Sequence, residues 1–168
     1  MIQKFKTRLS VKSSLISLYI ALTIPIPFIT SEQLKITSLF LFIFGLLFVI
    51  SITSDYVETC ETKISYKTSF ISRAFGKKNW DINWDQIESI KSLPTSQGSK
   101  VFYFVNTKGK SLLVPQRIEN FDAFLDKIHK KTNKNTEGLS YISPLWTYKL
   151  LTFLSVLVIV GEISLFLV

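Results

Sequence analysis

Long apolar runs alternate with charged stretches along this chain. Three runs stand out, over residues 13–31, 36–54 and 150–168, and the first two hold 19 residues each without a charge. A helix of about 20 residues crosses a hydrocarbon core of roughly 30 Å. Backbone amides buried in lipid must find partners within their own segment, which a helix provides. The pattern therefore predicts a membrane protein with three transmembrane helices.

The first run carries two prolines, Pro25 and Pro27. Each removes a backbone donor, so we expect the first helix to kink or end near Ile24. A cleaved signal peptide is disfavoured as an interpretation of this run, because the run is long and no small-residue cleavage site follows it.

The third run differs from the others because Glu162 lies within it. A carboxylate at the centre of a span costs about 2.5 to 3.5 kcal/mol, and such residues usually face protein or water. If the helix starts near Pro144, Glu162 instead approaches the far interface and the cost largely disappears. The first alternative implies a partner helix that offers a base or a hydroxyl group, and both alternatives stay open.

The flanks of the runs predict an orientation, since basic residues are retained on the cytoplasmic side. Residues 1–12 carry four bases, whereas the turn after the first run carries Lys35 against Glu32. We expect a basic cytoplasmic tail over 1–12, a helical hairpin over 13–54 and a third helix over 144–168. The N-terminus and the segment after the hairpin should then lie inside, and the C-terminus outside.

Between the hairpin and the third helix, apolar residues alternate over short stretches and adopt helical spacing once. This pattern predicts a small α+β domain over residues 55–133, followed by a linker over 134–143. The helix begins after Ile118 and buries a stripe of Phe121, Phe124, Leu125 and Ile128. The strand candidates are residues 56–66, 69–75, 80–84, 87–93, 101–106 and 111–115, with hairpin turns at Gly76 and Gly109.

A set of local patterns in this segment carries a resemblance. They are Gly76-Lys77-Lys78 in a turn, the sequence WDQIESI over 84–90, an aromatic strand, Gly109, a strand ending in Pro115, and NFDAF over 120–124 opening the helix. Together they resemble the bacterial pleckstrin-homology-like domain family, whose members commonly follow two transmembrane helices. The resemblance implies a strongly bent sheet of about seven strands closed by the C-terminal helix. The six strand candidates become seven if residues 56–66 form two strands. Otherwise this chain has fewer strands than the family pattern.

The plan of two N-terminal spans before a small domain is also similar to a family of photosystem I assembly factors of chloroplasts and cyanobacteria. That similarity implies a thylakoid membrane, as the alternative to a bacterial plasma membrane. The third span departs from many relatives of the pleckstrin-homology-like type.

The sequence offers little for catalysis or for binding a cofactor. Cys60 and His129 are single residues of their types, so no zinc set of cysteines and histidines can form, and the glycines make no phosphate-binding fingerprint. We interpret Cys60 as a small strand residue and His129 as a polar position on the helix. Asp55, Glu58 and Glu61 are predicted to form a solvated cluster beside the membrane.

Two candidate surfaces remain. A basic hairpin could bind an anionic lipid head group, although a solvated turn explains the same residues: Lys63, Lys67, Arg73, Lys77 and Lys78. An aromatic surface, joined by Glu162 in the membrane, could contact a protein partner, and its residues would be Trp80, Trp84, Phe102, Tyr103 and Phe104.

The sequence therefore predicts a non-enzymatic membrane protein without a cofactor, whose cytoplasmic domain acts as a scaffold or assembly module for a protein partner. The alternative is recognition of anionic lipid by the basic hairpin. The net charge of +8 attracts anionic lipid and nucleic acid alike, and tethering to a membrane favours lipid. We expect no nucleic-acid partner, and the oligomeric state stays open.

Overall fold

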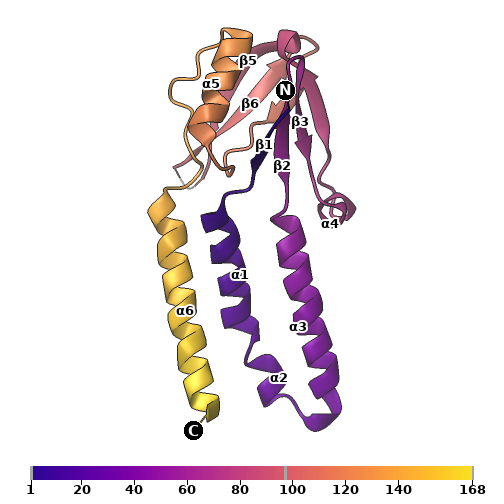
Figure 1. Cartoon of the computed structure of the whole chain (residues 1–168), viewed down its shortest axis with the longest axis vertical. Helices are drawn as coiled ribbons and strands as arrows, with labels where there is room; N and C mark the ends of the chain where they lie inside the picture. The colour runs from indigo at the N-terminus through magenta and orange to yellow at the C-terminus, as the bar shows by residue number, and fades with distance from the viewer. Residues whose placement is uncertain (1, 97, 168) are drawn as a thin grey trace. The chain divides into compact units, whose positions relative to one another are not determined.

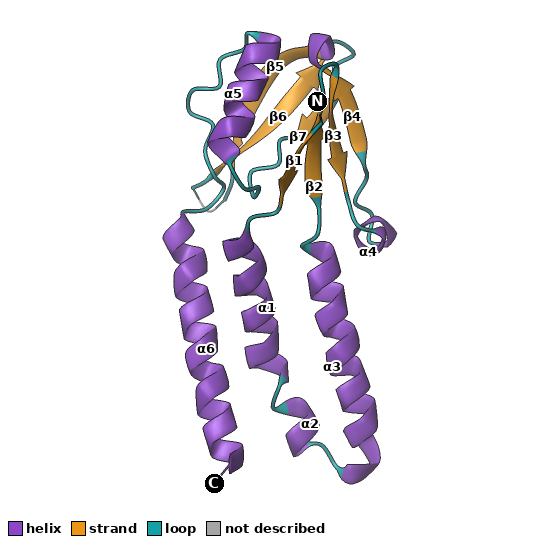
Figure 2. Ribbon diagram, in the orientation of Figure 1, coloured by secondary structure: helices purple, strands orange, loops and turns teal. Residues whose placement is uncertain are grey.

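The computed structural model describes residues 2–96 and 98–167, and the chain forms two compact units. Met1–Arg8 and Ser54–Ser143 make up the first, called the sheet unit here. Leu9–Thr53 and Pro144–Val168 make up the second, called the helix unit. The described residues thus form a mixed α+β protein with two antiparallel sheets and three long apolar helices (Figures 1 and 2).

The sheet unit contains a four-stranded and a three-stranded antiparallel sheet. The first runs in the order β1 (Gln3–Lys6), β2 (Tyr56–Thr59), β3 (Lys63–Lys67) and β4 (Trp80–Asn83). The second runs in the order β5 (Ile87–Pro94), β6 (Lys100–Asn106) and β7 (Ser111–Leu113). A short helix α4 (Phe70–Ala74) joins β3 to β4, a 3₁₀ turn (Trp84–Gln86) joins the sheets, and α5 (Phe121–Thr132) follows them.

Strand β1 is the first difference from the sequence prediction. Residues 1–12 were expected to form a tail, but Gln3–Lys6 pairs with β2, with Lys6 opposite Tyr56. Phe5 explains the difference, because its side chain is 2% exposed and its ring meets that of Phe124 edge-on at 5.3 Å. One apolar residue among bases was too weak a signal for a strand.

The second difference concerns residues 69–75, which were expected to form a strand. They form helix α4 instead, because the Ser69 side chain caps it by accepting a hydrogen bond from the Ser72 amide at 3.1 Å. The candidate over residues 56–66 splits into β2 and β3 around Cys60, as the resemblance allowed. The described residues therefore contain seven strands.

The core of the sheet unit lies between the sheets and α5. The predicted stripe of Phe121, Phe124, Leu125 and Ile128 is confirmed, since all four side chains are at least 91% buried. They pack against buried residues of both sheets, including Phe5, Val57, Ile64, Ile82, Phe102, Phe104 and Leu112. Helix α5 thus holds the two sheets together.

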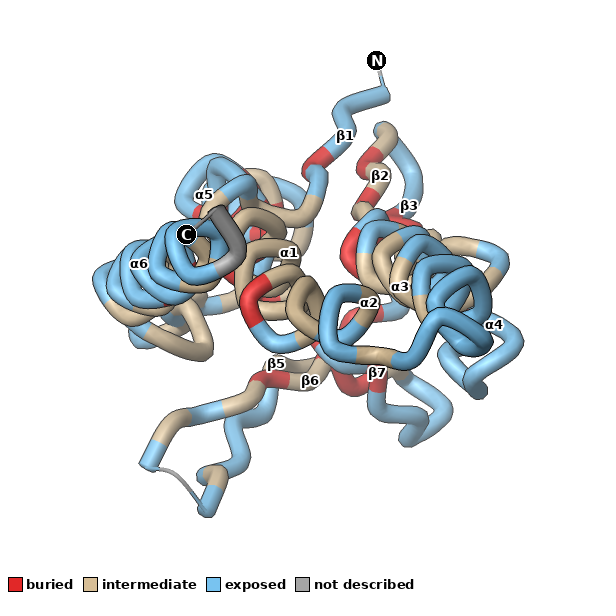
Figure 3. Tube along the Cα trace, turned by 90° about the horizontal axis from the view of Figure 1, so that it is seen from below, coloured by how far each residue is buried: buried red, intermediate tan, exposed pale blue. Residues whose placement is uncertain are grey.

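The helix unit contains α1 (Leu9–Thr23), α2 (Ile26–Ile29), α3 (Glu32–Ile52) and α6 (Leu145–Leu167). Three stretches are long and apolar enough to cross a membrane: Leu9–Ile29, Glu32–Ile52 and Leu145–Leu165. The break between α1 and α2 falls at Pro25, which confirms the predicted end of the first helix near Ile24. Most of α3 and α6 is exposed within the unit (Figure 3), as suits helices in lipid.

Helix α1 contacts both α3 and α6. Against α3, the Tyr19 hydroxyl donates to the Phe42 carbonyl at 2.8 Å, and the two rings stack with centroids 5.9 Å apart. Gly45 makes room for the Tyr19 ring, because a methyl group there would overlap it. Small buried residues, Ser14 and Ala21 on α1 and Ser155 on α6, are typical of close packing between helices in membranes.

Candidate functional site

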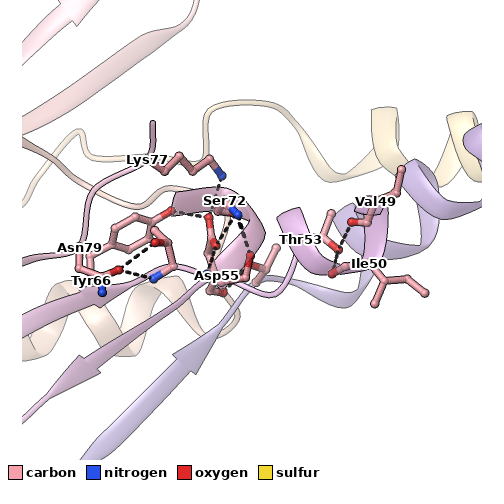
Figure 4. A network of polar contacts seen from close by, with 11 residues as sticks. Val49, Ile50, Thr53, Asp55, Tyr66, Ser72, Lys77 and Asn79 are labelled. Carbon is pink, nitrogen blue, oxygen red and sulfur yellow. Dashed lines mark hydrogen bonds and ion pairs between the residues drawn. The ribbon is translucent and has the colours of Figure 1, made fainter. Parts of the chain in front are cut away.

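A buried carboxylate organises one end of the sheet unit. Asp55 is 6% exposed, and its two oxygens accept four hydrogen bonds (Figure 4). Oδ2 accepts from the Tyr66 hydroxyl at 2.9 Å and from Lys77 Nζ at 2.7 Å. Oδ1 accepts from the Ser69 amide and from the Ser72 hydroxyl, both at 3.2 Å. Asp55 was predicted to belong to a solvated cluster, and its burial corrects that prediction.

The four donors explain how a charge is stable in this position. A buried carboxylate is costly unless it is paired and fully hydrogen-bonded. Here Lys77, whose side chain is half exposed, supplies the counter-charge. Burial raises the pKa of Tyr66, and the negative charge and the hydrogen bond of Asp55 raise it further. Tyr66 therefore remains a neutral donor to the carboxylate over the ordinary pH range.

Asp55 also ties the first two strands together through its backbone. Its carbonyl accepts from the Thr7 hydroxyl at 2.7 Å and from the Thr7 amide at 3.3 Å. Thr7 directly follows β1, and Asp55 directly precedes β2. One residue thus connects the end of β1, the start of β2 and the segment between β3 and β4.

That segment, residues 68–79, is called the basic loop here. It is closed by Asn79, whose Oδ1 accepts from both the amide and the hydroxyl of Thr68 at 2.8 Å. Its sequence contains Arg73, Lys77 and Lys78 and no acidic residue. The bonds from Asp55 and Asn79 give the loop a defined conformation on the sheet unit.

The outer surface of the basic loop combines cations with aromatic rings. Phe70 is 78% exposed and Phe75 is 73% exposed. Arg73 and Lys78 are exposed beside them, and the Arg73 guanidinium lies 5.9 Å from the centre of the Phe70 ring. The sequence predicts the bases of this surface but not the two phenylalanines, because residues 69–75 were expected to form a strand.

The five bases predicted for lipid binding separate into two groups. Lys63 and Lys67 lie on β3, and both approach Asp81 of β4, at 3.7 and 3.5 Å. A hydrogen bond from Ser65 lowers the pKa of Asp81, and the two lysines lower it further. Arg73, Lys77 and Lys78 share the basic loop, which leaves three of the five bases there.

The predicted aromatic contact surface is mostly core. Trp84, Phe102 and Phe104 are at most 5% exposed, so they are not available to a partner at the surface. Trp84 also donates from Nε1 to the Cys60 carbonyl at 3.0 Å. Trp80 and Tyr103 are half-buried, and the Trp80 ring packs between those of Tyr66 and Phe104.

Cys60 and His129, the single cysteine and the single histidine of the chain, lie against different neighbours. The Cys60 thiol donates to the Lys63 carbonyl at 3.3 Å, and a hydrogen bond with the Thr62 hydroxyl lowers the pKa of Cys60. His129 Nδ1 lies 2.8 Å from the Lys134 carbonyl oxygen. Across residues 2–96 and 98–167, no three histidine, cysteine or acidic side chains gather closely enough to hold a metal ion.

The remaining predicted acids lie apart from the basic loop. Glu58 pairs with Lys4 at 3.0 Å on the first sheet, and Glu61 pairs with Lys131 of α5. Glu162 is half-buried within the helix unit. Its Oε2 atom is buried and has no hydrogen-bond partner among the described residues.

The chain is similar to a cyanobacterial protein whose function is not described. The chain is 26% identical over 147 residues to the uncharacterized protein slr0269 of the cyanobacterium Synechocystis sp. (strain PCC 6803). The match covers 84% of this chain and 74% of that protein. No family model matches the chain.

Proposed function

We propose that this chain is a non-catalytic integral membrane protein whose sheet unit is a pleckstrin-homology-like domain that binds anionic lipid at the surface of its own membrane. The observation that carries the proposal is the hydrogen-bonded attachment of the basic loop to Asp55, three residues beyond the end of α3 at Ile52. Recognition would use the exposed cations of that loop, Arg73 and Lys78, with Lys77 beside them.

The pleckstrin-homology-like assignment is supported by the number of strands and by the helix that follows them. The resemblance seen in the sequence implied about seven strands and a closing C-terminal helix. The described residues contain four strands in one sheet, three in the other, and α5 after them. Strand β1, which was not predicted from the sequence, brings the number of described strands to seven.

The pairing of β1 with β2 supports the predicted helical hairpin. Helix α1 begins three residues after β1 ends, and β2 begins four residues after α3 ends. Because β1 and β2 are neighbouring strands, the chain must leave and re-enter the sheet unit at almost the same place. Two crossings of one membrane, with β1 and the rest of the sheet unit on the same side, satisfy this requirement. The four bases before residue 13 favour the cytoplasmic side.

Chain length keeps the basic loop near lipid. A fully extended chain spans at most about 3.6 Å per residue, so Asp55 lies within about 11 Å of the end of α3. The loop is bonded directly to Asp55. A basic residue close to an anionic membrane surface contributes about 1 kcal/mol of attraction. Lys77 already pairs with Asp55, so the attraction comes mainly from exposed Arg73 and Lys78. With no acidic residue in the loop sequence, these two bases give an electrostatic preference for anionic lipid.

The lipids that purify with the full-length chain test this function. The protein would be extracted from its own membrane in a mild detergent, and retained lipids and proteins would be quantified by mass spectrometry. We expect the double variant Arg73→Glu with Lys78→Glu to lose at least about tenfold of the anionic lipid retained per chain, since two attractions of about 1 kcal/mol each become repulsions.

A matched control is available on the turn between β6 and β7. Lys108 and Lys110 are both exposed there, and their reversal to glutamate changes the net charge equally. The control should retain the wild-type amount of anionic lipid. Equal retention by the Arg73→Glu and Lys78→Glu variant would refute the proposal. A stoichiometric protein that purifies with both variants would instead favour the scaffold function predicted from the sequence.

A further inference from the structure

We infer that Phe70 and Phe75 insert into the membrane leaflet beneath the sheet unit, so that the ligand of the basic loop is the bilayer surface itself and not a soluble phosphate-bearing molecule. This inference rests on the proposed function and specifies its ligand.

The phenylalanines of the sheet unit fall into two classes. The unit contains seven, and five of them are at most 4% exposed: Phe5, Phe102, Phe104, Phe121 and Phe124. Phe70 and Phe75 are instead 78% and 73% exposed. Both belong to α4 and the residue that follows it. An isolated exposed apolar residue is ordinary, but two large rings at the two ends of one short helix form a local apolar surface.

Helix α4 turns a polar residue inward and exposes an aromatic ring beside Arg73. Its buried residue is Ser72, 1% exposed, whose hydroxyl bonds to Asp55. Its exposed residues include Phe70 and, at its C-terminal end, Phe75. A soluble domain normally buries the apolar face of a helix and exposes the polar one. Here the polar face is fixed inward by Asp55, and this arrangement holds the rings outward.

The surroundings of the two rings match a membrane interface. Arg73 lies between them in the sequence, and Lys77 and Lys78 follow directly. Helices that lie in a membrane surface combine aromatic or aliphatic residues with lysine and arginine in this way. The rings would enter the boundary between head groups and acyl chains, while the bases would meet phosphate groups at the same depth. Attachment to Asp55, close to the end of α3, keeps the loop within reach of that boundary.

The test measures the depth of the loop in the full-length protein. Cys60→Ser gives a chain without cysteine, and serine retains a hydroxyl for the bond to the Lys63 carbonyl. A single cysteine would then replace exposed Ala74, between the two rings, and carry an environment-sensitive fluorophore. The labelled protein would be reconstituted into vesicles of phosphatidylcholine with phosphatidylglycerol. Lys108→Cys, on the exposed turn between β6 and β7, provides the reference position.

The inference predicts a blue-shifted fluorophore at position 74 that is quenched by nitroxide-labelled lipid and protected from a water-soluble quencher. The fluorophore at position 108 should show the opposite behaviour. The double substitution Phe70→Ser with Phe75→Ser should give the fluorophore at position 74 the emission of a label in water. Both side chains are exposed, so this double variant should keep the fold, and unchanged circular dichroism would verify it.

The outcomes separate the inference from the proposed function. An aqueous signal at position 74, with lipid retention still dependent on Arg73 and Lys78, would overturn insertion and leave lipid binding intact. Loss of that charge dependence would overturn the proposed function. Protection of position 74 in native membranes but not in vesicles would show a protein partner on the rings and would also overturn the inference. Addition of inorganic phosphate should leave the signal at position 74 unchanged.

Discussion

Asp55 is the residue on which the arrangement of the basic loop depends. We expect Asp55→Asn to lower the free energy of unfolding by about 2 kcal/mol, because an amide replaces one acceptor oxygen with a donor and removes the partner charge of Lys77. Hydrogen exchange at the amides of Ser69 and Ser72 should also accelerate. Denaturant unfolding and hydrogen-exchange mass spectrometry in detergent would measure the two effects.

Exposed Asp85 provides the control for that substitution. Asp85→Asn makes the same chemical change outside the network, and it should leave both stability and exchange in the basic loop close to wild type. Equal effects of Asp55→Asn and Asp85→Asn would show that the network does not stabilise the loop.

Tyr66 gives this network a pH dependence. Its pKa is raised in the folded state, mainly by burial, so folding favours the neutral phenol. The stabilisation is complete below the unfolded pKa of about 10 and declines as the pH rises toward the folded pKa. Between about pH 10 and pH 11 the free energy of unfolding should therefore fall by up to about 1.4 kcal/mol from this group. Tyr66→Phe should make the decline shallower, and an unchanged decline would contradict the assignment.

The residues of this network show what a sequence can and cannot predict. The stripe of Phe121, Phe124 and Ile128 was predictable, because helical spacing is a local property of the chain. The burial of Asp55 was not, because its four donors come from residues 11 to 22 positions away and meet only in the fold. An acid next to a predicted span is ordinarily solvated, and nothing in the local sequence separates this one from Glu58.

Helix α4 shows the same limit for a whole element. The sequence over 69–75 has no strict two-residue alternation, and five residues are too few for helical periodicity to be recognised. The serine cap and the bonds from Asp55 decide the conformation. The misassigned element also concealed the pair of exposed rings, because on a strand residues 70 and 75 would lie on opposite faces of the sheet. The long helices, in contrast, follow from length and composition alone.

The contact between α1 and α3 depends on a residue without a side chain. Gly45→Ala would place a methyl group against the Tyr19 ring, which must shift and lose its hydrogen bond to the Phe42 carbonyl. Overpacking of this kind costs about 1 kcal/mol or more. Thermal unfolding in detergent should show a lower midpoint for Gly45→Ala. Gly161→Ala on α6 is the control, because nothing lies within 4 Å of an added methyl group there; it should match or exceed wild-type stability.

Strand β1 makes the sheet unit discontinuous in sequence. A fragment of residues 54–143 lacks β1 and therefore lacks Phe5 from its core. We expect that fragment to fold poorly, and we expect a chain in which residues 1–8 are joined to 54–143 by a two-residue Asn-Gly turn to fold alone. The turn is short enough because Thr7 and Asp55 are already hydrogen-bonded. Dispersed amide signals in NMR spectra of the joined chain, absent from the fragment, would confirm this. Equal spectra would show that β1 is dispensable.

The pairing of β1 with β2 also constrains the path of the entire chain. Both ends of the hairpin belong to one sheet, so the turn between α2 and α3 must lie across the membrane from the sheet unit if α1 and α3 each cross it once. Single cysteines at Gln33 and at Lys108, both exposed, test this in a Cys60→Ser background. A membrane-impermeant thiol reagent applied to sealed vesicles of known orientation should reach position 108 only from the cytoplasmic side and position 33 only from the other. Labelling of both positions from one side would mean that the hairpin enters the membrane without crossing it. The positive charges before residue 13 would then have no bearing on the side occupied by the sheet unit.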